Sequence, residues 1–264
     1  MDAAGFACGE AIISEVNCFN GAIVKKYKIA ACILHYGDPA LTGRLYGQLK
    51  AEPDVYVLDN AAPEPFPGAW KRLEENLFWA GALAWALREF EGMGYTHLWF
   101  FNNDAYFLSR PPYLKTSAVR LARMELALGR VGIYAPAVSA SPYHPQMVQN
   151  ENSQYRSVAV LDGIAPLVNF KCIREIGGLD AADNPYGYGV DLWMSVRARE
   201  AGWSLVVDNQ VLLRHSYHAT ARKVDGFMDK AAEAERRFLQ ARLGVDYKNF
   251  IREQQKQCRE IISL

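Results

Sequence analysis

Residues 99–105 read Trp-Phe-Phe-Asn-Asn-Asp-Ala (WFFNNDA), a run of three bulky apolar residues that stops abruptly at two amides and a carboxylate. With Thr96-His97-Leu98 in front, the apolar part has the length and composition of a buried strand. In open α/β sheets, ligands bind beyond the carboxyl ends of the strands. A strand that ends in Asn102, Asn103 and Asp104 therefore predicts a ligand site at that edge of a sheet.

Similar apolar runs recur along the chain, and helix-like segments separate them. The further strands that we predict cover residues 28–36, 54–60 and 130–138. A helix is predicted after the turn at 37–40, and another over 70–94, where two glycines mark its end. Continuous apolar strands that alternate with helices indicate an α/β fold, with a parallel sheet covered on both faces.

The pattern predicts one main domain without internal repeats. Residues 1–27 read as an N-terminal lead-in, and residues 28–224 hold the alternating strands and helices. Residues 225–264 are rich in Ala, Glu, Lys, Arg and Gln, which favour a helical tail, with a break near Gly244.

Polar clusters follow several of the predicted strands directly. His35-Tyr36 comes after the first strand, Asp59-Asn60 after the second, and Asn102-Asn103-Asp104 after the third. Because the carboxyl ends of parallel strands meet at one edge of a sheet, we expect the three clusters to converge on one rim.

The composition excludes several classes of function. Lys plus Arg and Asp plus Glu both number 29, so no global charge attracts nucleic acid or an anionic membrane. The five cysteines are scattered and never in CxxC spacing, which argues against a disulfide framework and fits a reducing cytoplasm. No apolar run reaches the length of about 20 residues that a transmembrane helix needs. The glycine-rich phosphate loop, GxGxxG and GxSxG motifs are also missing.

Four segments in the right order resemble the GT-A nucleotide-sugar glycosyltransferases, and family 2 in particular. They are VYVLDNAAPE (55–64), ENLFWAGALAWAL (75–87), THLWFFNNDA (96–105) and LVNFKCIREIGGLDAADNPYGYGVDLWMSVRAREAGW (167–203). The last of these, with its GG-Leu-Asp turn and an acid at a helix start, is the most specific. The resemblance covers roughly residues 28–218, and it implies a GT-A fold, which is Rossmann-like with a mixed sheet and helices on both faces.

The resemblance also implies a reaction, the metal-dependent transfer of a sugar from a nucleotide-diphosphate donor to an acceptor hydroxyl, with inversion. Asp191 matches the general base, and Asp104 with His215 matches the ligands of Mn²⁺ or Mg²⁺, with His218 in reserve. Arg214, Arg222 and Lys223 could add charge against the diphosphate. The residues that match the donor site are His35, Tyr36, Asp59, Asn60, Asn76, Asn102 and Asn103.

Two departures from the family pattern keep other functions open. Asn102 replaces the first acid of the metal motif, and Tyr188-Gly189 stand where many relatives carry a Glu-Asp pair. One alternative is therefore a non-catalytic domain that binds a nucleotide sugar or a glycan. Another is a sugar nucleotidyltransferase, although HYGDPALTGR (35–44) is a poor version of the glycine-rich basic loop of that class.

The partners that follow are a nucleotide-sugar donor and a glycan, lipid-linked or protein acceptor. The amphipathic composition of the tail could place it on a membrane surface or against a second subunit, so we expect a cytoplasmic protein that could be peripheral to a membrane. No residue pattern identifies the sugar, the nucleobase or the acceptor.

Overall fold

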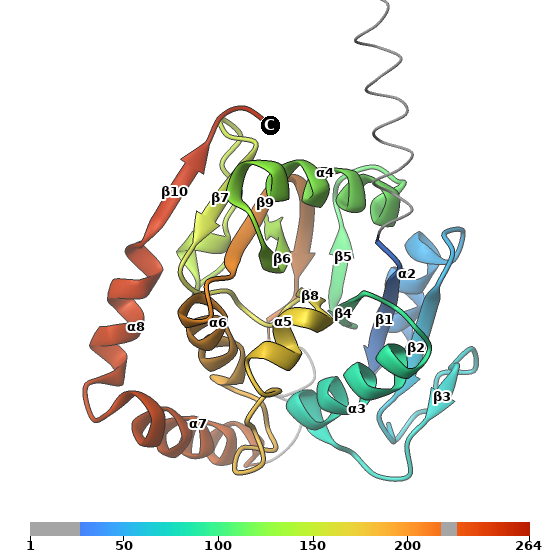
Figure 1. Cartoon of the computed structure of the whole chain (residues 1–264). Helices are drawn as coiled ribbons and strands as arrows, with labels where there is room; N and C mark the ends of the chain where they lie inside the picture. The colour runs from blue at the N-terminus through green and yellow to red at the C-terminus, as the bar shows by residue number, and fades with distance from the viewer. Residues whose placement is uncertain (1–26, 218–225) are drawn as a thin grey trace, which may run out of the picture.

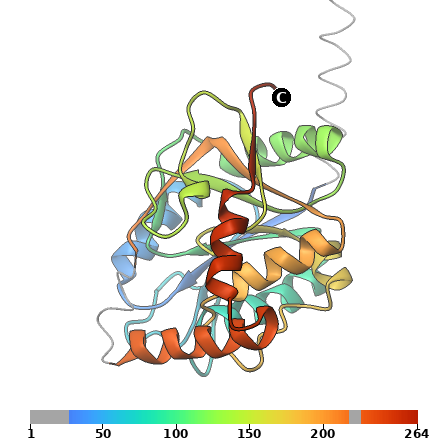
Figure 2. The ribbon, with the colours of Figure 1, turned by 90° about the vertical axis from the view of Figure 1, so that its left-hand side faces the viewer.

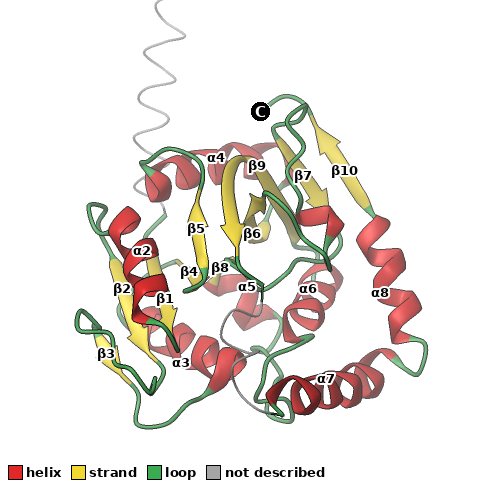
Figure 3. Ribbon diagram, turned by 180° about the vertical axis from the view of Figure 1, so that it is seen from behind, coloured by secondary structure: helices red, strands yellow, loops and turns green. Residues whose placement is uncertain are grey.

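The computed structural model describes residues 27–217 and 226–264, and the strands in this part of the chain form one ten-stranded mixed sheet. Its order is β10-β7-β9-β6-β8-β4-β1-β2-β3, and β5 pairs with β9 (Figures 1 and 3). The strands are β1 (Ile29–His35), β2 (Val55–Asp59), β3 (Lys71–Arg72), β4 (His97–Asn102), β5 (Ala105–Phe107), β6 (Val131–Val138), β7 (Tyr155–Val158), β8 (Leu167–Asn169), β9 (Ser204–His215) and β10 (Cys258–Ile261).

The first strand, β1, runs parallel to β2 on one side and to β4 on the other. All seven residues of β1 are buried, and so are the first five of β4. These are the continuous apolar runs of the sequence, and they are apolar throughout because helices cover both faces of the strands.

The helices are α2 (Pro39–Leu49), α3 (Phe78–Gly92), α4 (Tyr113–Leu128), α5 (Phe170–Glu175), α6 (Val190–Glu200), α7 (Phe227–Leu243) and α8 (Tyr247–Lys256). In Figure 1, α3, α5 and α6 lie in front of the sheet, and in Figure 3, which is seen from behind, α2 lies in front of it. The predicted fold class, a mixed sheet with helices on both faces, is confirmed.

The helix predicted over 70–94 begins only at Phe78, because residues near the start of this range form a strand. Lys71 and Arg72 extend the sheet beside Leu58 and Asp59 of β2. The Arg72 guanidinium also binds the Asp59 carboxylate, with Nη1 2.7 Å from Oδ2. A local hydrogen-bond pattern thus overrides the helical composition of this segment.

The second half of the sheet brings two distant segments together. β8 runs antiparallel between β4 and β6, and β6 runs parallel to β9. The short β5, just after Asp104, pairs antiparallel with the end of β9, so that Ala105 lies opposite His215. This register places Asp104 beside His215, although 111 residues separate them along the chain.

The C-terminal segment belongs to the same body as the sheet. The predicted break near Gly244 is confirmed, since α7 ends at Leu243 and Gly244 has a φ of 82°. Figure 2 shows α8 rising from the end of α7 toward β10, which pairs antiparallel with β7. Residues 258–261 are therefore a strand, in contrast to the helix that we predicted. Among the helices of the described residues, none is both long and apolar enough to cross a membrane.

Candidate active site

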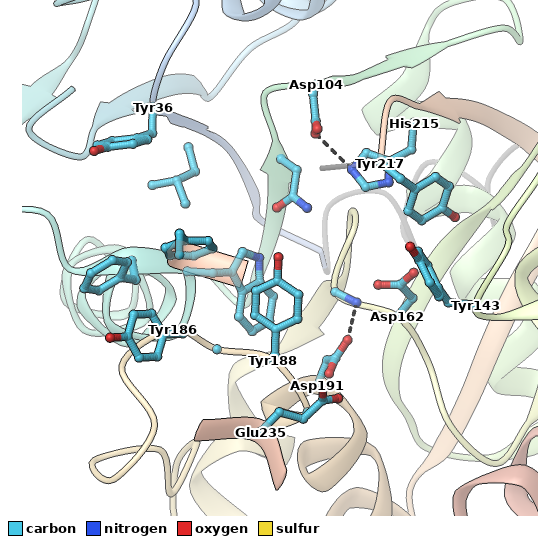
Figure 4. A pocket seen from close by; sticks show the side chains of 18 of the residues that line it. Tyr36, Asp104, Tyr143, Asp162, Tyr186, Tyr188, Asp191, His215, Tyr217 and Glu235 are labelled. Atoms are coloured by element: carbon cyan, nitrogen blue, oxygen red, sulfur yellow. Dashed lines mark hydrogen bonds and ion pairs between the residues drawn. The ribbon is translucent and has the colours of Figure 1, made fainter. Parts of the chain in front are cut away.

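A cavity of about 530 Å³ lies at the carboxyl ends of β1, β2, β4 and β9. It is the predicted rim, and Figure 4 shows many of its side chains. Eight of the residues predicted from the sequence line it: Tyr36, Asn60, Asn76, Asn102, Asn103, Asp104, Asp191 and His215. Asp104 and Asp191, the predicted metal ligand and the predicted base, thus face one space.

Asp104 and His215 form a close pair at the top of Figure 4. Nε2 of His215 lies 2.9 Å from Oδ1 of Asp104, and the two side chains are only 9% and 11% exposed. The pair is held by the β5–β9 register and by Ser216, whose backbone N–H donates to the carbonyl of Asp104. The His215 ring also packs edge-on against Tyr217, at 4.4 Å between centroids.

The geometry of this pair suits a divalent cation. Ligand atoms about 2.1 Å from an ion and at right angles to each other lie about 3 Å apart. Within the described residues, no group of three or more His, Cys, Asp or Glu side chains is arranged to hold a metal alone. Two protein ligands are enough where phosphate oxygens and water complete the shell, as is common for Mg²⁺. Asp104 and His215 are the residues that would hold it.

Asn60 and Asn76, two of the residues predicted to bind a donor, link the end of β2 to the start of α3. The Asn60 amide donates to Oδ1 of Asn76 at 2.8 Å and accepts from the backbone N–H of Leu77 at 2.9 Å. Asn76 Oδ1 also accepts from the backbone N–H of Phe78 at 2.8 Å. Two amides that the sequence suggested separately therefore form one connected group.

His35 lies outside the cavity wall. It is fully buried, and its ring nitrogens lie 2.7 Å from Oγ1 of Thr42 and 2.8 Å from the carbonyl oxygen of Glu64. The same Thr42 hydroxyl accepts from the amide of Asn103 at 3.0 Å, and Asn103 does line the cavity. His35 is thus placed to orient Asn103 through Thr42, and its direct contact with a donor stays a prediction.

Asp59 also lies outside the wall and is fully buried. Its carboxylate accepts from the backbone N–H groups of Ala62 and Phe66, in addition to Arg72. These contacts anchor the loop after β2. The nucleobase contact predicted for Asp59 is untested, and the geometry of the apo chain gives its side chain a structural task.

Asp191 lies in the first turn of α6. Its Oδ2 accepts from the backbone N–H of Gly163 at 2.7 Å, and its Oδ1 accepts from the backbone N–H of Leu192 at 2.8 Å. Burial, and then the charge of Asp162, raise the pKa of Asp191 from 3.8 to about 6. A carboxylate with a raised pKa is a better proton acceptor for a hydroxyl.

Two further carboxyl groups line the cavity that the sequence reasoning missed, Asp162 and Glu235. Burial is the largest cause that raises the pKa of Asp162 to about 6, with the charge of Asp104 adding to it. Burial and then Asp191 raise the pKa of Glu235 to about 7. Four carboxyl groups therefore surround one space, and no Lys or Arg occurs among the described residues that line it.

His144 is another lining residue that the sequence did not single out. Its Nε2 lies 3.9 Å from Oδ2 of Asp162, and burial lowers the pKa of its ring, with Asp191 opposing this shift. Aromatic side chains make up much of the remaining wall: Phe78, Trp79, Tyr143, Tyr186, Tyr188, Tyr217 and Phe227. They come from the start of α3, from loops and from α7.

Several secondary candidates are not part of the wall. Arg214 lies on β9 opposite Tyr106 and does not line the cavity. His218, Arg222 and Lys223 lie outside the described residues.

Comparisons with known proteins identify relatives of unknown function. No family model matches the chain. Uncharacterised proteins of Mycobacterium tuberculosis (strain ATCC 25618 / H37Rv) and Mycobacterium bovis (strain ATCC BAA-935 / AF2122/97) are 28% identical to it over 195 residues, which is 70% of this chain and 73% of theirs.

Two solved structures have a similar architecture. A mannosyltransferase from Pyrobaculum calidifontis in complex with GDP-Man and Mn²⁺ superposes with a TM-score of 0.53 at 14% identity, over 84% of this chain and 73% of its own. GalNAc-T7 with UDP, GalNAc and Mn²⁺ superposes with a TM-score of 0.56 at 9% identity, over 72% of this chain. The match spans 44% of the length of GalNAc-T7. At these identities the likeness concerns the fold, and this chain has the GT-A fold.

Proposed function

We propose that this chain is a metal-dependent glycosyltransferase that moves a sugar from a nucleoside-diphosphate donor to an acceptor hydroxyl. The observation that carries the proposal is one cavity with two chemical ends, an Asp104–His215 pair at 2.9 Å and a half-buried carboxylate, Asp191. The nucleotides bound in the two neighbouring structures are consistent with it, because UDP and GDP-Man are both nucleoside-diphosphate compounds.

The charge of the cavity supports a metal-dependent reaction. Four carboxyl groups line the cavity, and they would repel a diphosphate unless a cation lay between the phosphate oxygens and the carboxylates. When bound, Mn²⁺ or Mg²⁺ would neutralise charge on the leaving diphosphate. Asp104 and His215 would hold the cation beside the diphosphate, with Asn102 next to them. The nucleoside and the sugar would face Tyr36, Asn60, Asn76 and Asn103.

Asp191 is the base in this scheme. The acceptor oxygen forms a bond to the anomeric carbon, the bond from that carbon to the diphosphate oxygen breaks, and the hydroxyl proton moves to the Asp191 carboxylate. The electron pair of the broken bond leaves with the diphosphate. Attack from the face opposite the leaving group inverts the anomeric centre, as in the family 2 enzymes that the sequence resembles.

The test combines binding with turnover. Nucleoside diphosphates with Mn²⁺ should raise the melting temperature of the wild-type chain, and a panel of nucleotide sugars should identify the donor by slow hydrolysis. Asp191→Asn should lower transfer by about 10²- to 10⁴-fold, because it removes the proton acceptor. The thermal stabilisation should survive in this variant.

Asp229→Asn, on the exposed side of α7, is the matched control and should behave as the wild type. Full transfer in Asp191→Asn would refute the role of this residue. Stabilisation of the wild type without any turnover would favour a non-catalytic nucleotide-sugar-binding domain. Consumption of a nucleoside triphosphate and a sugar phosphate would instead identify a nucleotidyltransferase.

A further inference from the structure

The side of the cavity away from the Asp104–His215 pair has a different chemistry. In Figure 4 that pair lies at the top, while Tyr186, Tyr188 and Glu235 lie at the bottom. We call this side the α7 wall, because much of it comes from that helix. It consists of Phe78, Tyr186, Tyr188, Phe227, Met228 and Glu235.

Three aromatic rings of the α7 wall form a compact group. Ring centroids lie 4.9 Å apart for Phe78 and Tyr186, 5.5 Å for Tyr186 and Phe227, and 6.1 Å for Phe78 and Phe227. All three residues line the cavity although they come from α3, a loop and α7. The rings therefore present an apolar platform to whatever occupies this end.

Phe78 is held in a conformation that costs free energy. Its φ is +52°, a value that residues with a bulky side chain rarely adopt. The Asn76 side chain, which accepts from the Phe78 N–H, helps to hold this backbone in place. Strained residues persist mainly where the strain serves a site, and here it puts a phenyl ring at the cavity.

Glu235 adds a carboxyl group to the apolar platform. The negative charge of the nearby Asp191 raises the pKa of Glu235, and the positive charge of Lys248 lowers it. A partly buried carboxylate is stabilised by hydrogen-bond donors, and a hydrocarbon ligand offers none. A ring with several hydroxyl groups satisfies both features, because its C–H face packs on aromatic rings and its hydroxyls donate to carboxylates.

We propose that the α7 wall is the acceptor subsite and that the acceptor is a pyranose. Its ring packs on Phe78, Tyr186 and Phe227, and Glu235 accepts a hydrogen bond from a hydroxyl next to the one that Asp191 activates. This inference rests on the proposed function, and it makes Glu235 an acceptor-binding residue. A polyprenyl chain at this wall would leave two carboxyl groups against hydrocarbon.

The experiment measures acceptor binding directly. Saturation-transfer NMR is recorded on the full chain with methyl glucoside, galactoside, mannoside and N-acetylglucosaminide, in the presence of UDP or GDP and Mg²⁺, which is diamagnetic. Citronellyl phosphate is the lipid probe. The variants are Glu235→Gln and Phe227→Ala, and the controls are Asp229→Asn on the same helix and Phe250→Ala on α8.

At least one methyl pyranoside should give saturation transfer to the wild type and to both controls. Glu235→Gln should weaken its binding by about tenfold, the loss of one charge-assisted hydrogen bond, and Phe227→Ala should abolish the signal. Melting temperatures with UDP or GDP and Mn²⁺ should show that both variants fold and keep the donor end. Phe78→Gly, which removes the ring and relieves the positive φ, is the further check if Phe227→Ala does not fold.

The inference fails if no pyranoside binds, if binding is unchanged in Glu235→Gln and Phe227→Ala, or if only citronellyl phosphate binds. Failure of the proposed function looks different. In that case neither UDP nor GDP with Mn²⁺ would stabilise the wild type and no nucleotide sugar would be hydrolysed, whatever the pyranosides do.

Discussion

At the scale of single residues, the first prediction concerns Asp104, which we propose as a ligand of the cation. Asn in its place keeps the size but removes the charge, and neutral amide oxygens bind divalent ions more weakly. We expect Asp104→Asn to weaken Mn²⁺ binding by more than about 100-fold. This exceeds the loss of affinity that is typical when a residue hydrogen-bonded to a metal ligand is mutated. The measurement is the Mn²⁺ concentration needed for thermal stabilisation by UDP or GDP.

Without ligand, Asp104→Asn should be at least as stable as the wild type. The reason is that the charge of Asp104 raises the pKa of Asp162, and the substitution removes this repulsion. His215→Ala should lose the same Mn²⁺ dependence, whereas Asp229→Asn should keep it. Unchanged Mn²⁺ titrations in both Asp104→Asn and His215→Ala would mean that the cation binds elsewhere.

Glu235 gives a second prediction, which concerns pH. Its pKa rises from 4.5 to about 7 on folding, so between these values the folded chain binds a proton that the unfolded chain has lost. The stability that this group contributes is complete below its unfolded pKa and is lost as the pH rises through its folded pKa. The groups that act on Glu235 are Asp191 from α6 and Lys248 from α8.

Glu235→Gln should therefore stabilise the chain at about pH 8 by about 1–3 kcal/mol, and the difference should shrink toward zero at about pH 5. Urea unfolding at both pH values measures it. A variant that is equally stable or less stable at about pH 8 would show that Glu235 is charged at little cost in the folded chain.

At the scale of secondary-structure elements, the proposed metal-binding end depends on β5, a strand of only three residues. One side chain pins β5: the Gln48 amide donates to the carbonyl of Phe107 at 2.9 Å and accepts from its backbone N–H at 2.8 Å. Gln48 belongs to α2, so this helix fixes the position of β5 and, through it, of Asp104.

Gln48→Leu should cost about 1–3 kcal/mol of stability, because it leaves two backbone groups of β5 without their partner. It should also weaken Mn²⁺ binding, since Asp104 precedes the loosened strand. Urea unfolding and the Mn²⁺ titration test the two effects. Gln240→Ala, whose partner is the exposed Arg236, should change stability by less than about 0.5 kcal/mol. Equal behaviour of the two variants would count against the pinning role of Gln48.

The packing of α7 against Gly189 restricts the residue at that position. Gly189 has a φ of +79°, and a Cβ at this position would lie 2.9 Å from Cδ1 of Leu239 on α7. The space that a larger side chain would need here is taken by this helix. Tyr188 and Gly189 therefore add no carboxyl group to the cavity, and α7 supplies one at Glu235.

At the scale of the whole molecule, local sequence patterns predicted several strands and the polar residues that follow them. The strands around Ile33, Val57 and Phe100 were recognisable from their apolar runs, and the polar residues at their ends do meet at one cavity. Strand alternation explains the exceptions. Leu34 and Tyr36 line the cavity, so His35 between them points away.

Asp162 and Glu235 could not be predicted in the same way. Asp162 lies in a loop, and Glu235 lies on a helix whose position depends on contacts with residues far away in the sequence, such as Gly189. Neither position carries a local signal that separates it from a solvated acid. For the same reason, the helical tail predicted for residues 225–264 does not include β10, whose partner β7 is about 100 residues away.

The integration of the C-terminal segment leads to the last prediction. Glu260 on β10 binds Arg156 on β7, with Oε1 2.5 Å from Nε, and the Arg156 side chain is 9% exposed. Ser153 donates to the same carboxylate. The Glu260 side chain is 32% exposed, and Arg156 keeps hydrogen bonds to two backbone carbonyls without it, so Glu260→Ala should cost about 1–3 kcal/mol.

The matched control is Glu253→Ala on α8, whose partner Lys256 is exposed, and it should cost less than about 1 kcal/mol. Urea unfolding compares the two variants, and fluorescence and circular dichroism should report one shared transition. If residues 225–264 were instead a separable unit, Glu260→Ala would lower only a minor transition and leave that of the sheet in place. Because β10 lies at the opposite end of the strand order from β1 and β2, UDP or GDP with Mn²⁺ should still stabilise the folded variant.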